Sequence, residues 1–218
     1  MINNVLFDLD GTLADTAPDL ANALNAIRLK HGLEKLPLEV ISPTVSLGGN
    51  AMIKLAFNLE EGDSGFEERR DEFLNYYLQH IAEETRLYDG MEELLKSLES
   101  NNKTWGIVTN KSGWLTTPLL EALSLDKRAA CVVCGDTLEQ RKPHPAPVIH
   151  ACELIHAKPS STIYIGDAQR DIEAGNRAGT KTLVALYGYI EENEEPKSWN
   201  ADAMVSSVHE INDIISEL

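Results

Sequence analysis

Basic residues are scarce in this sequence: its 218 residues include 19 Lys and Arg against 35 Asp and Glu, giving a formal net charge of -16. A surface this acidic repels nucleic acid and anionic membranes, so we expect neither as a partner. It also repels phosphate esters. Any site for an anionic ligand must therefore be a local group of cations and backbone N–H groups, which makes each Lys or Arg near a candidate site informative.

The sequence also has few cysteines and no long apolar run. Its three cysteines are an odd number without the spacing of a disulfide framework, which fits a reducing cytoplasm. No window approaches the roughly 18 apolar residues that indicate a membrane-spanning helix. The first residues, MINNVLFDLDGTL, have no basic region or small-residue cleavage site of a signal peptide. We therefore expect a soluble, cytoplasmic protein.

Strand-like and helix-like segments alternate along most of the chain. Short apolar runs rich in β-branched residues predict strands that are buried on both faces; they lie at 5–7, 104–109, 131–134, 162–166 and 182–186. Amphipathic stretches between them predict helices, at about 89–101, 114–124, 145–157 and 170–178. This alternation predicts an α/β fold with a Rossmann-like parallel sheet. After the last of these strands we expect a surface loop, a short strand and a helix.

Residues 15–86 break the alternation, because they show helical periodicity and no convincing strand. The interval is too long for a simple crossover between two strands. We interpret it as a helical cap inserted into a catalytic core formed by residues 1–14 and 87–218. Pro37, Pro43 and the Gly48–Gly49 pair should separate its helices. A helical subdomain that only adds to the core remains an alternative.

Two aspartates, Asp8 and Asp10, follow the first predicted strand in the sequence FDLDGT. In a parallel α/β sheet the carboxyl ends of the strands form the ligand crevice, so both side chains should arrive where a ligand binds. Two carboxylates this close repel each other unless a cation or a shared proton relieves them. The alternative is a strand followed by an ordinary Asx turn at Asp10-Gly11.

Three more predicted strands end in, or lead to, polar residues. Thr109 ends one strand, and its hydroxyl could bind a phosphoryl oxygen. Lys142 stands in RKPHP, where the prolines restrict the loop and could hold its ammonium group against an anion. Asp167 and Asp171 follow the strand TIYIG. Each has an ordinary structural interpretation: a strand-ending Thr, an exposed loop Lys and a helix N-terminal acid.

Magnesium is the cofactor that this acidic set would suit. Mg²⁺ prefers hard oxygen ligands in octahedral geometry, usually one or two carboxylates with water and phosphate oxygens. Asp8, the backbone carbonyl of Asp10 and Asp167 would meet that demand.

Taken together, the set DxDGT, strand-end Thr, Lys-Pro and GDxxxD resembles the haloacid dehalogenase superfamily of phosphotransferases. The resemblance covers the whole chain, because a helical cap inserted after the first strand is that family's first (C1) cap type. It implies that Asp8 attacks phosphorus and forms an aspartyl phosphate, while Asp10 acts as general acid and then as base. It implies further that Thr109 and Lys142 bind the phosphoryl group and that Asp171 orients the metal ligands.

Within the superfamily, Asp10 argues against a dehalogenase and Leu9 against a P-type ATPase. The chain is similar to the phosphoglycolate phosphatase group in FDLDGTLADTAPD, LGGNAM, VTNK and GDAQRDIEAGNRAGTKT. It more closely resembles the N-acetylmuramic acid 6-phosphate phosphatases of cell-wall sugar recycling, in GFEERRDEFLNYYLQH, LYDGMEELL and the tail YGYI…W…AD. The implied substrate is a small phosphorylated metabolite, hydrolysed by a monomer or homodimer. The expected substrate-binding residues are Gly48, Gly49, Asn50, Asn110 and Lys111, although the glycine pair could also be a plain turn between helices.

Two other functions remain open from the sequence. A phospho-accepting receiver domain uses a similar acidic cluster, Thr and Lys, but it has no large helical insertion after the first strand. A sugar phosphomutase shares every catalytic motif, because closure of the cap decides whether water or a sugar accepts the phosphoryl group.

Overall fold

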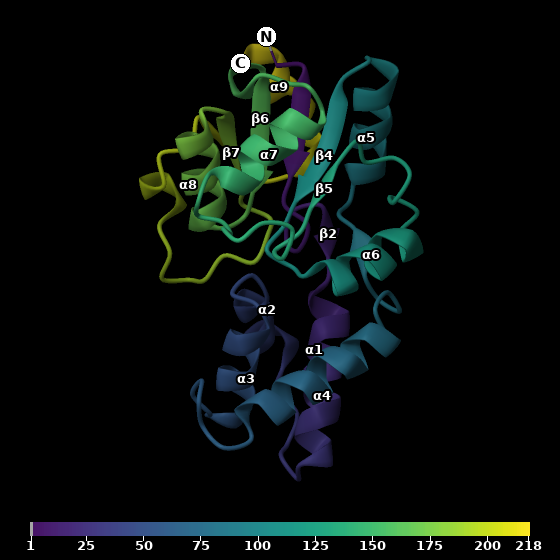
Figure 1. Ribbon diagram of the computed structural model, residues 1–218, viewed down its shortest axis with the longest axis vertical. Helices are drawn as coiled ribbons and strands as arrows, with labels where there is room; N and C mark the ends of the chain where they lie inside the picture. The colour runs from purple at the N-terminus through teal and green to yellow at the C-terminus, as the bar shows by residue number, and fades with distance from the viewer. Residues whose placement is uncertain (1) are drawn as a thin grey trace.

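The computed structural model describes residues 2–218 and contains a six-stranded, fully parallel sheet in the order β5-β4-β1-β6-β7-β8 (Figure 1). The strands are β1 Asn4–Phe7, β4 Thr104–Val108, β5 Val132–Val133, β6 Thr162–Gly166, β7 Lys181–Ala185 and β8 Ala203–Val205. Every strand segment predicted from the sequence overlaps one of these strands. The α/β prediction with a parallel sheet is therefore confirmed.

Helices cover both faces of the sheet, and the alternation of side chains along β1 shows how. Val5 and Phe7 pack on one face with helices α5 Met91–Ser100, α6 Gly113–Ala122 and α9 Ile211–Glu217. Leu6 points to the other face, against α7 Ala146–Leu154 and α8 Gln169–Ala178. Successive strand residues face opposite sides, so a strand in the middle of such a sheet must be apolar throughout.

Short 3-10 helices lie at Pro159–Ser161, Pro196–Ser198 and Val208–Glu210. The predicted loop, short strand and helix at the end of the chain are present as residues 186–202, β8 and α9. Among residues 2–218, no helix has the length and apolar character needed to cross a membrane.

Between the first and second long strands the chain forms four helices: α1 Ala17–Lys30, α2 Leu38–Val45, α3 Gly49–Phe57 and α4 Phe66–Gln79. They share a hydrophobic core of their own, which includes Leu24, Ile41, Phe66, Phe73 and Tyr77. In Figure 1 these helices extend from the end of the sheet where its carboxyl strand ends lie. Pro37 and Gly48 stand at helix starts as expected, but Pro43 lies inside α2, which corrects its expected role as a separator.

The expectation of no strand between Asp15 and Arg86 is wrong at its two ends. β2 Ala14–Asp15 and β3 Arg86–Leu87 pair antiparallel where the chain enters and leaves the helical segment. Strands of two residues are too short to produce the alternating pattern by which strands are predicted.

Candidate active site

Asp8 lies at the carboxyl end of β1, the strand between β4 and β6. Its backbone N–H donates to the carbonyl of Ile165 at 2.8 Å, which continues the pairing of β1 with β6. The side chain of Asp8 therefore lies where the strands of the sheet end. Asp8 is buried. Burial disfavours the charged form and is the main reason that its pKa is raised to about 6, although the Lys142 ammonium opposes the shift.

Lys142 supplies the buried positive charge of the site. Its Nζ lies 2.9 Å from Asp8 Oδ1 and 2.8 Å from Asp171 Oδ1. The same group donates to the Val108 carbonyl at 2.9 Å and to the Tyr164 hydroxyl at 2.7 Å. Burial alone would favour the neutral amine, but the two carboxylates outweigh it and raise the pKa of Lys142. The lysine is therefore charged and fixed in place.

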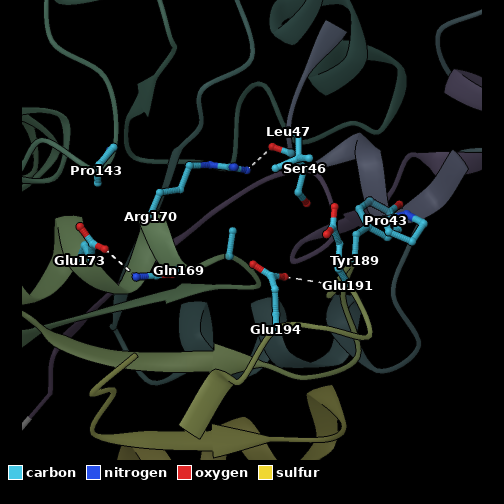
Figure 2. Close-up of a pocket in the computed structure, with 11 residues that line it drawn as sticks. Pro43, Ser46, Leu47, Pro143, Gln169, Arg170, Glu173, Tyr189, Glu191 and Glu194 are labelled. Carbon is cyan, nitrogen blue, oxygen red and sulfur yellow. Dashed lines mark hydrogen bonds between the residues drawn. The ribbon is translucent and has the colours of Figure 1, made fainter. Parts of the chain in front are cut away.

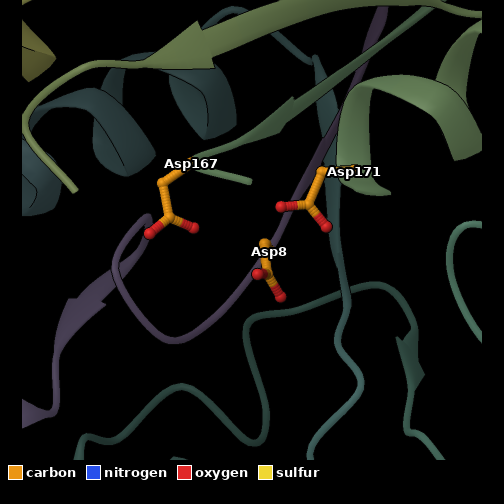
Figure 3. A group of neighbouring side chains, drawn as sticks. All are labelled: Asp8, Asp167 and Asp171. Carbon is orange, nitrogen blue, oxygen red and sulfur yellow. The ribbon is translucent and has the colours of Figure 1, made fainter. Parts of the chain in front are cut away.

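Three carboxyl groups lie close together at this end of the sheet: those of Asp8, Asp167 and Asp171 (Figure 3). Asp167 directly follows β6, and Asp171 lies in the first turn of α8. One carboxylate oxygen from each lies within 4.8 Å of the others. Burial, and then the charges of Asp8 and Asp171, raise the pKa of Asp167 to about 7. Carboxyl groups from two separate motifs thus form one buried cluster, as the parallel topology predicted.

The cluster fits a hard divalent cation. Its donors are all carboxylate oxygens, the ligand type that Mg²⁺ and Ca²⁺ prefer. Among residues 2–218, Lys142 is the only residue that forms an ion pair with any of the three carboxylates. Asp8 Oδ1 is buried without a hydrogen-bond partner, because the close contact with Lys142 lacks hydrogen-bond alignment. A bound cation would occupy that oxygen and offset the remaining negative charge.

Glycine in both acidic motifs makes room for these carboxyl groups. A Cβ atom on Gly166 would overlap the side chain of Asp171, and one on Gly11 would overlap the carboxylate of Asp167. Gly11 also has a φ of +82°, which L-residues with side chains rarely adopt. The "DG" and "GD" of the two motifs are therefore explained by close approach around the cluster as well as by turn geometry.

Asp10 is directed to a different partner from Asp8. Its Oδ1 accepts hydrogen bonds from Thr16 Oγ1 at 2.6 Å and from Lys111 Nζ at 2.8 Å. Lys111 Nζ in turn lies 4.7 Å from the centroid of the Tyr77 ring, which belongs to α4. Burial favours the neutral amine, but the Asp10 carboxylate outweighs it and raises the pKa of Lys111. The charge of Lys111 is thus matched by Asp10, and its expected role in substrate binding stays a prediction.

Thr109 and Asn110 follow β4 and lie beside this pair. Thr109 is buried, and its Oγ1 accepts from the backbone N–H of Lys111 at 3.1 Å. The Asn110 side chain donates to the Lys142 carbonyl at 3.0 Å and accepts from the Lys142 N–H at 3.2 Å. Asn110 therefore holds the backbone of the loop that carries Lys142, a contact that the sequence did not indicate.

A cavity of about 720 Å³ lies between the strand ends and the helical segment. The predicted site residues that line it are Asp8, Asp10, Gly48, Gly49, Asn50, Thr109, Asn110 and Lys111. Lys142, Asp167 and Asp171 are not among its lining residues. Gly48 precedes α3 with a φ of +87°, so a left-handed conformation, for which glycine is favoured, places this loop at the cavity wall.

Comparison with known proteins agrees with this site. The family described as "Haloacid dehalogenase-like hydrolase" matches residues 5–185. The chain belongs to the haloacid dehalogenase-like hydrolases. Residues 5–185 include the helical insertion and both acidic motifs, so the resemblance to this family is confirmed.

Relatives within this family are named phosphatases. The chain is 40% identical over 211 residues to an N-acetylmuramic acid 6-phosphate phosphatase of Pseudomonas putida, covering 97% of this chain and 95% of that protein. It is 40% identical to a phosphoglycolate phosphatase of Xanthomonas campestris, covering 92% of this chain and 90% of that one. A crystal structure of a predicted phosphoglycolate phosphatase from Haemophilus somnus has a TM-score of 0.87 at 27% identity, covering 98% of this chain and 97% of that one. The prediction of a phosphoric monoester hydrolase is confirmed, and the receiver-domain alternative is wrong.

Three residues of this haloacid dehalogenase-like hydrolase were missed by the sequence reasoning: Arg170, Ser46 and Tyr189. Arg170 is half-buried, and the carboxylates of the cluster raise its pKa against the effect of burial. Its guanidinium donates to the Ser46 carbonyl, beside a smaller cavity of about 300 Å³ (Figure 2). Tyr189, in the loop after β7, donates its backbone N–H to Asp167 Oδ2 at 2.8 Å. The scarcity of cations in this acidic chain was a signal that could have drawn attention to Arg170.

Proposed function

We propose that this protein is a Mg²⁺-dependent phosphomonoesterase that works through an aspartyl phosphate on Asp8. The observation that carries the proposal is the buried Asp8 carboxyl group at the cavity, with Lys142 at 2.9 Å and the carboxyl groups of Asp167 and Asp171 beside it. A nucleophile, a fixed cation and a set of metal-binding oxygens are the components that phosphoryl transfer requires.

In the first step an Asp8 carboxylate oxygen attacks phosphorus, the bond from phosphorus to the ester oxygen breaks, and Asp10 gives its proton to the leaving oxygen. In the second step Asp10 takes a proton from water as that water attacks phosphorus, which releases phosphate and regenerates Asp8. Lys111, 2.8 Å from Asp10, stabilises the carboxylate that Asp10 becomes between the two steps. Magnesium, held by Asp8, the Asp10 carbonyl and Asp167, would offset the negative charge of the carboxylates and the phosphate.

The remaining predicted residues would bind and position the substrate. Thr109 and Lys142 donate to phosphoryl oxygens, and Asp171 orients Lys142 through the contact at 2.8 Å. Asn110 and Lys111 lie next to the phosphate end of the cavity, while Gly48, Gly49 and Asn50 bring backbone and amide groups from the opposite wall. In this proposal residues 15–86 are a cap on a core of residues 1–14 and 87–218, and the cap closes over the substrate.

For the substrate, we propose N-acetylmuramic acid 6-phosphate over phosphoglycolate. Relatives of both names match the chain almost from end to end, so identity alone does not separate them. The cavity of about 720 Å³ falls within the range of roughly 300–1,000 Å³ that accommodates drug-sized ligands. That volume suits an amino-sugar phosphate better than a two-carbon acid. The cap and tail segments that resemble the amino-sugar phosphatases point in the same direction.

The test is a phosphate-release panel with N-acetylmuramic acid 6-phosphate, phosphoglycolate and a generic aryl phosphate, each with Mg²⁺ and with EDTA. We expect the amino-sugar phosphate to give the highest kcat/KM, and EDTA to stop and Mg²⁺ to restore phosphate release. A tenfold preference for phosphoglycolate, about 1.4 kcal/mol in transition-state binding, would overturn the sugar assignment and leave the phosphatase standing. Conversion of a sugar phosphate without net release of phosphate would identify a phosphomutase instead.

A further inference from the structure

Ser46 follows α2 in the helical segment, yet it is bound to the core at two points. Its Oγ donates to Asp167 Oδ2 at 3.0 Å, and its backbone carbonyl accepts from the Arg170 guanidinium. Figure 2 shows Arg170 extended from the start of α8 toward Ser46. This one residue of the cap therefore contacts two residues of the segment that leads from β6 into α8. Its side chain contacts Asp167, a member of the candidate metal cluster, and its backbone contacts Arg170.

The other donors to the Asp167 carboxylate come from the core. Thr12 Oγ1 donates to Oδ1 at 3.3 Å, and the backbone N–H of Tyr189 donates to Oδ2 at 2.8 Å. Within residues 2–218, Ser46 is the only residue of the cap that hydrogen-bonds to this carboxylate. If the cap moved away from the core, Asp167 would keep its contacts with Thr12 and Tyr189 and would lose the one with Ser46.

We infer that Ser46 is a positioning residue for Asp167 and that it couples closure of the cap to metal binding. Hydrogen-bond donors to a ligating carboxylate fix its orientation and strengthen its hold on the metal. With Ser46 and Tyr189 both donating to Oδ2, the carboxylate is held in one orientation before an ion arrives. Because coupling between two equilibria is reciprocal, metal binding must favour the closed cap by the same factor. The inference rests on the proposed role of Asp167 as a metal ligand.

The direct test is Mg²⁺ binding without substrate, measured by isothermal titration calorimetry on Ser46→Ala. Loss of a group that orients a metal ligand typically weakens metal affinity by about 10–100-fold, and we expect the lower end, about tenfold, because Tyr189 still donates to the same oxygen. Ser46→Thr keeps a hydroxyl and should restore most of the affinity. Thermal unfolding of each variant in EDTA checks that it is folded.

The matched control is Ser42→Ala. Ser42 lies on α2 four residues before Ser46, and its hydroxyl donates to the Leu38 carbonyl at 2.8 Å within the helix. This variant removes the same group from a position one turn earlier without touching the cluster, so its Mg²⁺ affinity should equal that of the wild type. An equal loss in both alanine variants would mean a general effect on the cap and would overturn the inference.

The reciprocal effect, of metal binding on the cap, provides a second, independent measurement. In the wild type, Mg²⁺ should slow amide hydrogen exchange in residues 38–50, because metal binding favours the closed cap; in Ser46→Ala this slowing should be lost. Equal Mg²⁺ affinity of wild type and Ser46→Ala overturns the inference and leaves the proposed function intact. A wild type that binds no Mg²⁺ overturns the metal role of Asp167 and the inference with it.

Discussion

At the scale of single residues, the pKa values of the Asp8 and Asp167 carboxyl groups are set by burial. Burial raises the pKa of Asp8 to about 6 and that of Asp167 to about 7, since few opposite charges lie within the cluster to stabilise the ionised forms. A cation bound at this cluster would favour the ionised form of both groups.

This arrangement predicts how stability depends on pH without metal. A carboxyl group with a higher pKa in the folded than in the unfolded protein stabilises the fold fully below the unfolded value, about 3.9, and loses that contribution as pH rises through the folded value. For Asp167 the window runs from about 4 to about 7. As the pH rises through this window, we expect the free energy of unfolding to fall less for Asp167→Asn than for the wild type. Urea denaturation in EDTA measures this difference. Parallel pH profiles for the two proteins would contradict the assigned pKa.

The glycines of the acidic motifs give a second prediction at this scale. Gly166→Ala should lower the free energy of unfolding by about 1–3 kcal/mol and greatly reduce turnover, because the new Cβ overlaps Asp171. Gly49→Ala is the control for stability: it lies in α3, and its Cβ would meet only the Leu74 side chain at 3.4 Å. That change should be neutral or slightly stabilising. Chemical denaturation of both variants checks the contrast.

At the level of elements, the helical segment α1–α4 is attached through the β2–β3 ribbon and through Asp19 of α1. Asp19 is buried, and its Oδ2 accepts from the Thr85 N–H at 2.8 Å and from Thr85 Oγ1 at 2.7 Å, just before β3. It also accepts from the Glu84 N–H at 2.9 Å. One carboxylate thus joins the entering and leaving segments of the chain.

Asp19→Ala should therefore destabilise the protein by about 2–3 kcal/mol, because it leaves buried donors without an acceptor. Asp126→Ala, at an exposed position, should change the free energy of unfolding by no more than about 0.5 kcal/mol. Urea denaturation of the two variants tests the difference. Equal stability would show that Asp19 does not join the two segments.

Some of these elements could be predicted from the sequence and others could not, for physical reasons. Buried parallel strands are continuous apolar runs, so the sheet and the polar residues at its carboxyl ends could be predicted before the structure was known. The two-residue strands β2 and β3 leave no such pattern. The hydrogen bond between Ser46 and Asp167 joins residues that are 121 positions apart in the sequence. It depends on how the helical segment packs against the rest of the chain, and no local sequence pattern encodes that packing. For the same reason the pairing of Lys111 with Asp10, rather than with an open phosphate site, was not foreseen.

At the scale of the whole molecule, the cavity gathers scarce positive charge in an acidic protein. Lys111, Arg70, Arg141 and Arg170 all line it, although the chain carries a net charge of -16. The cavity is also lined by four acidic residues, Asp8, Asp10, Glu61 and Asp71, so its lining is balanced in formal charge. A phosphorylated ligand would therefore meet less repulsion there than from the acidic chain as a whole. Under the proposed function the two walls would have separate roles, the strand-end residues acting on the phosphate and the residues of the helical segment contacting the rest of the substrate.

This division of labour predicts that cap changes alter specificity more than chemistry. Asn50→Ala should shift the ratio of kcat/KM between the amino-sugar phosphate and phosphoglycolate while hydrolysis of an aryl phosphate stays nearly intact, since remote contacts help only a substrate that makes them. Asn75→Ala, whose exposed side chain binds its own helix backbone, is the control and should leave the ratio unchanged. Uniform loss on every substrate would place Asn50 in the chemical step instead.

The central claim, that Asp8 is the nucleophile of a phosphatase, is tested most directly by phosphate release from Asp8→Asn. The variant keeps the shape of the side chain and the backbone bond to Ile165, so it should stay folded, as thermal unfolding can verify. With Mg²⁺ and N-acetylmuramic acid 6-phosphate or an aryl phosphate, the account predicts no phosphate release above background. Release by a folded Asp8→Asn protein at more than a few per cent of the wild-type rate would contradict it.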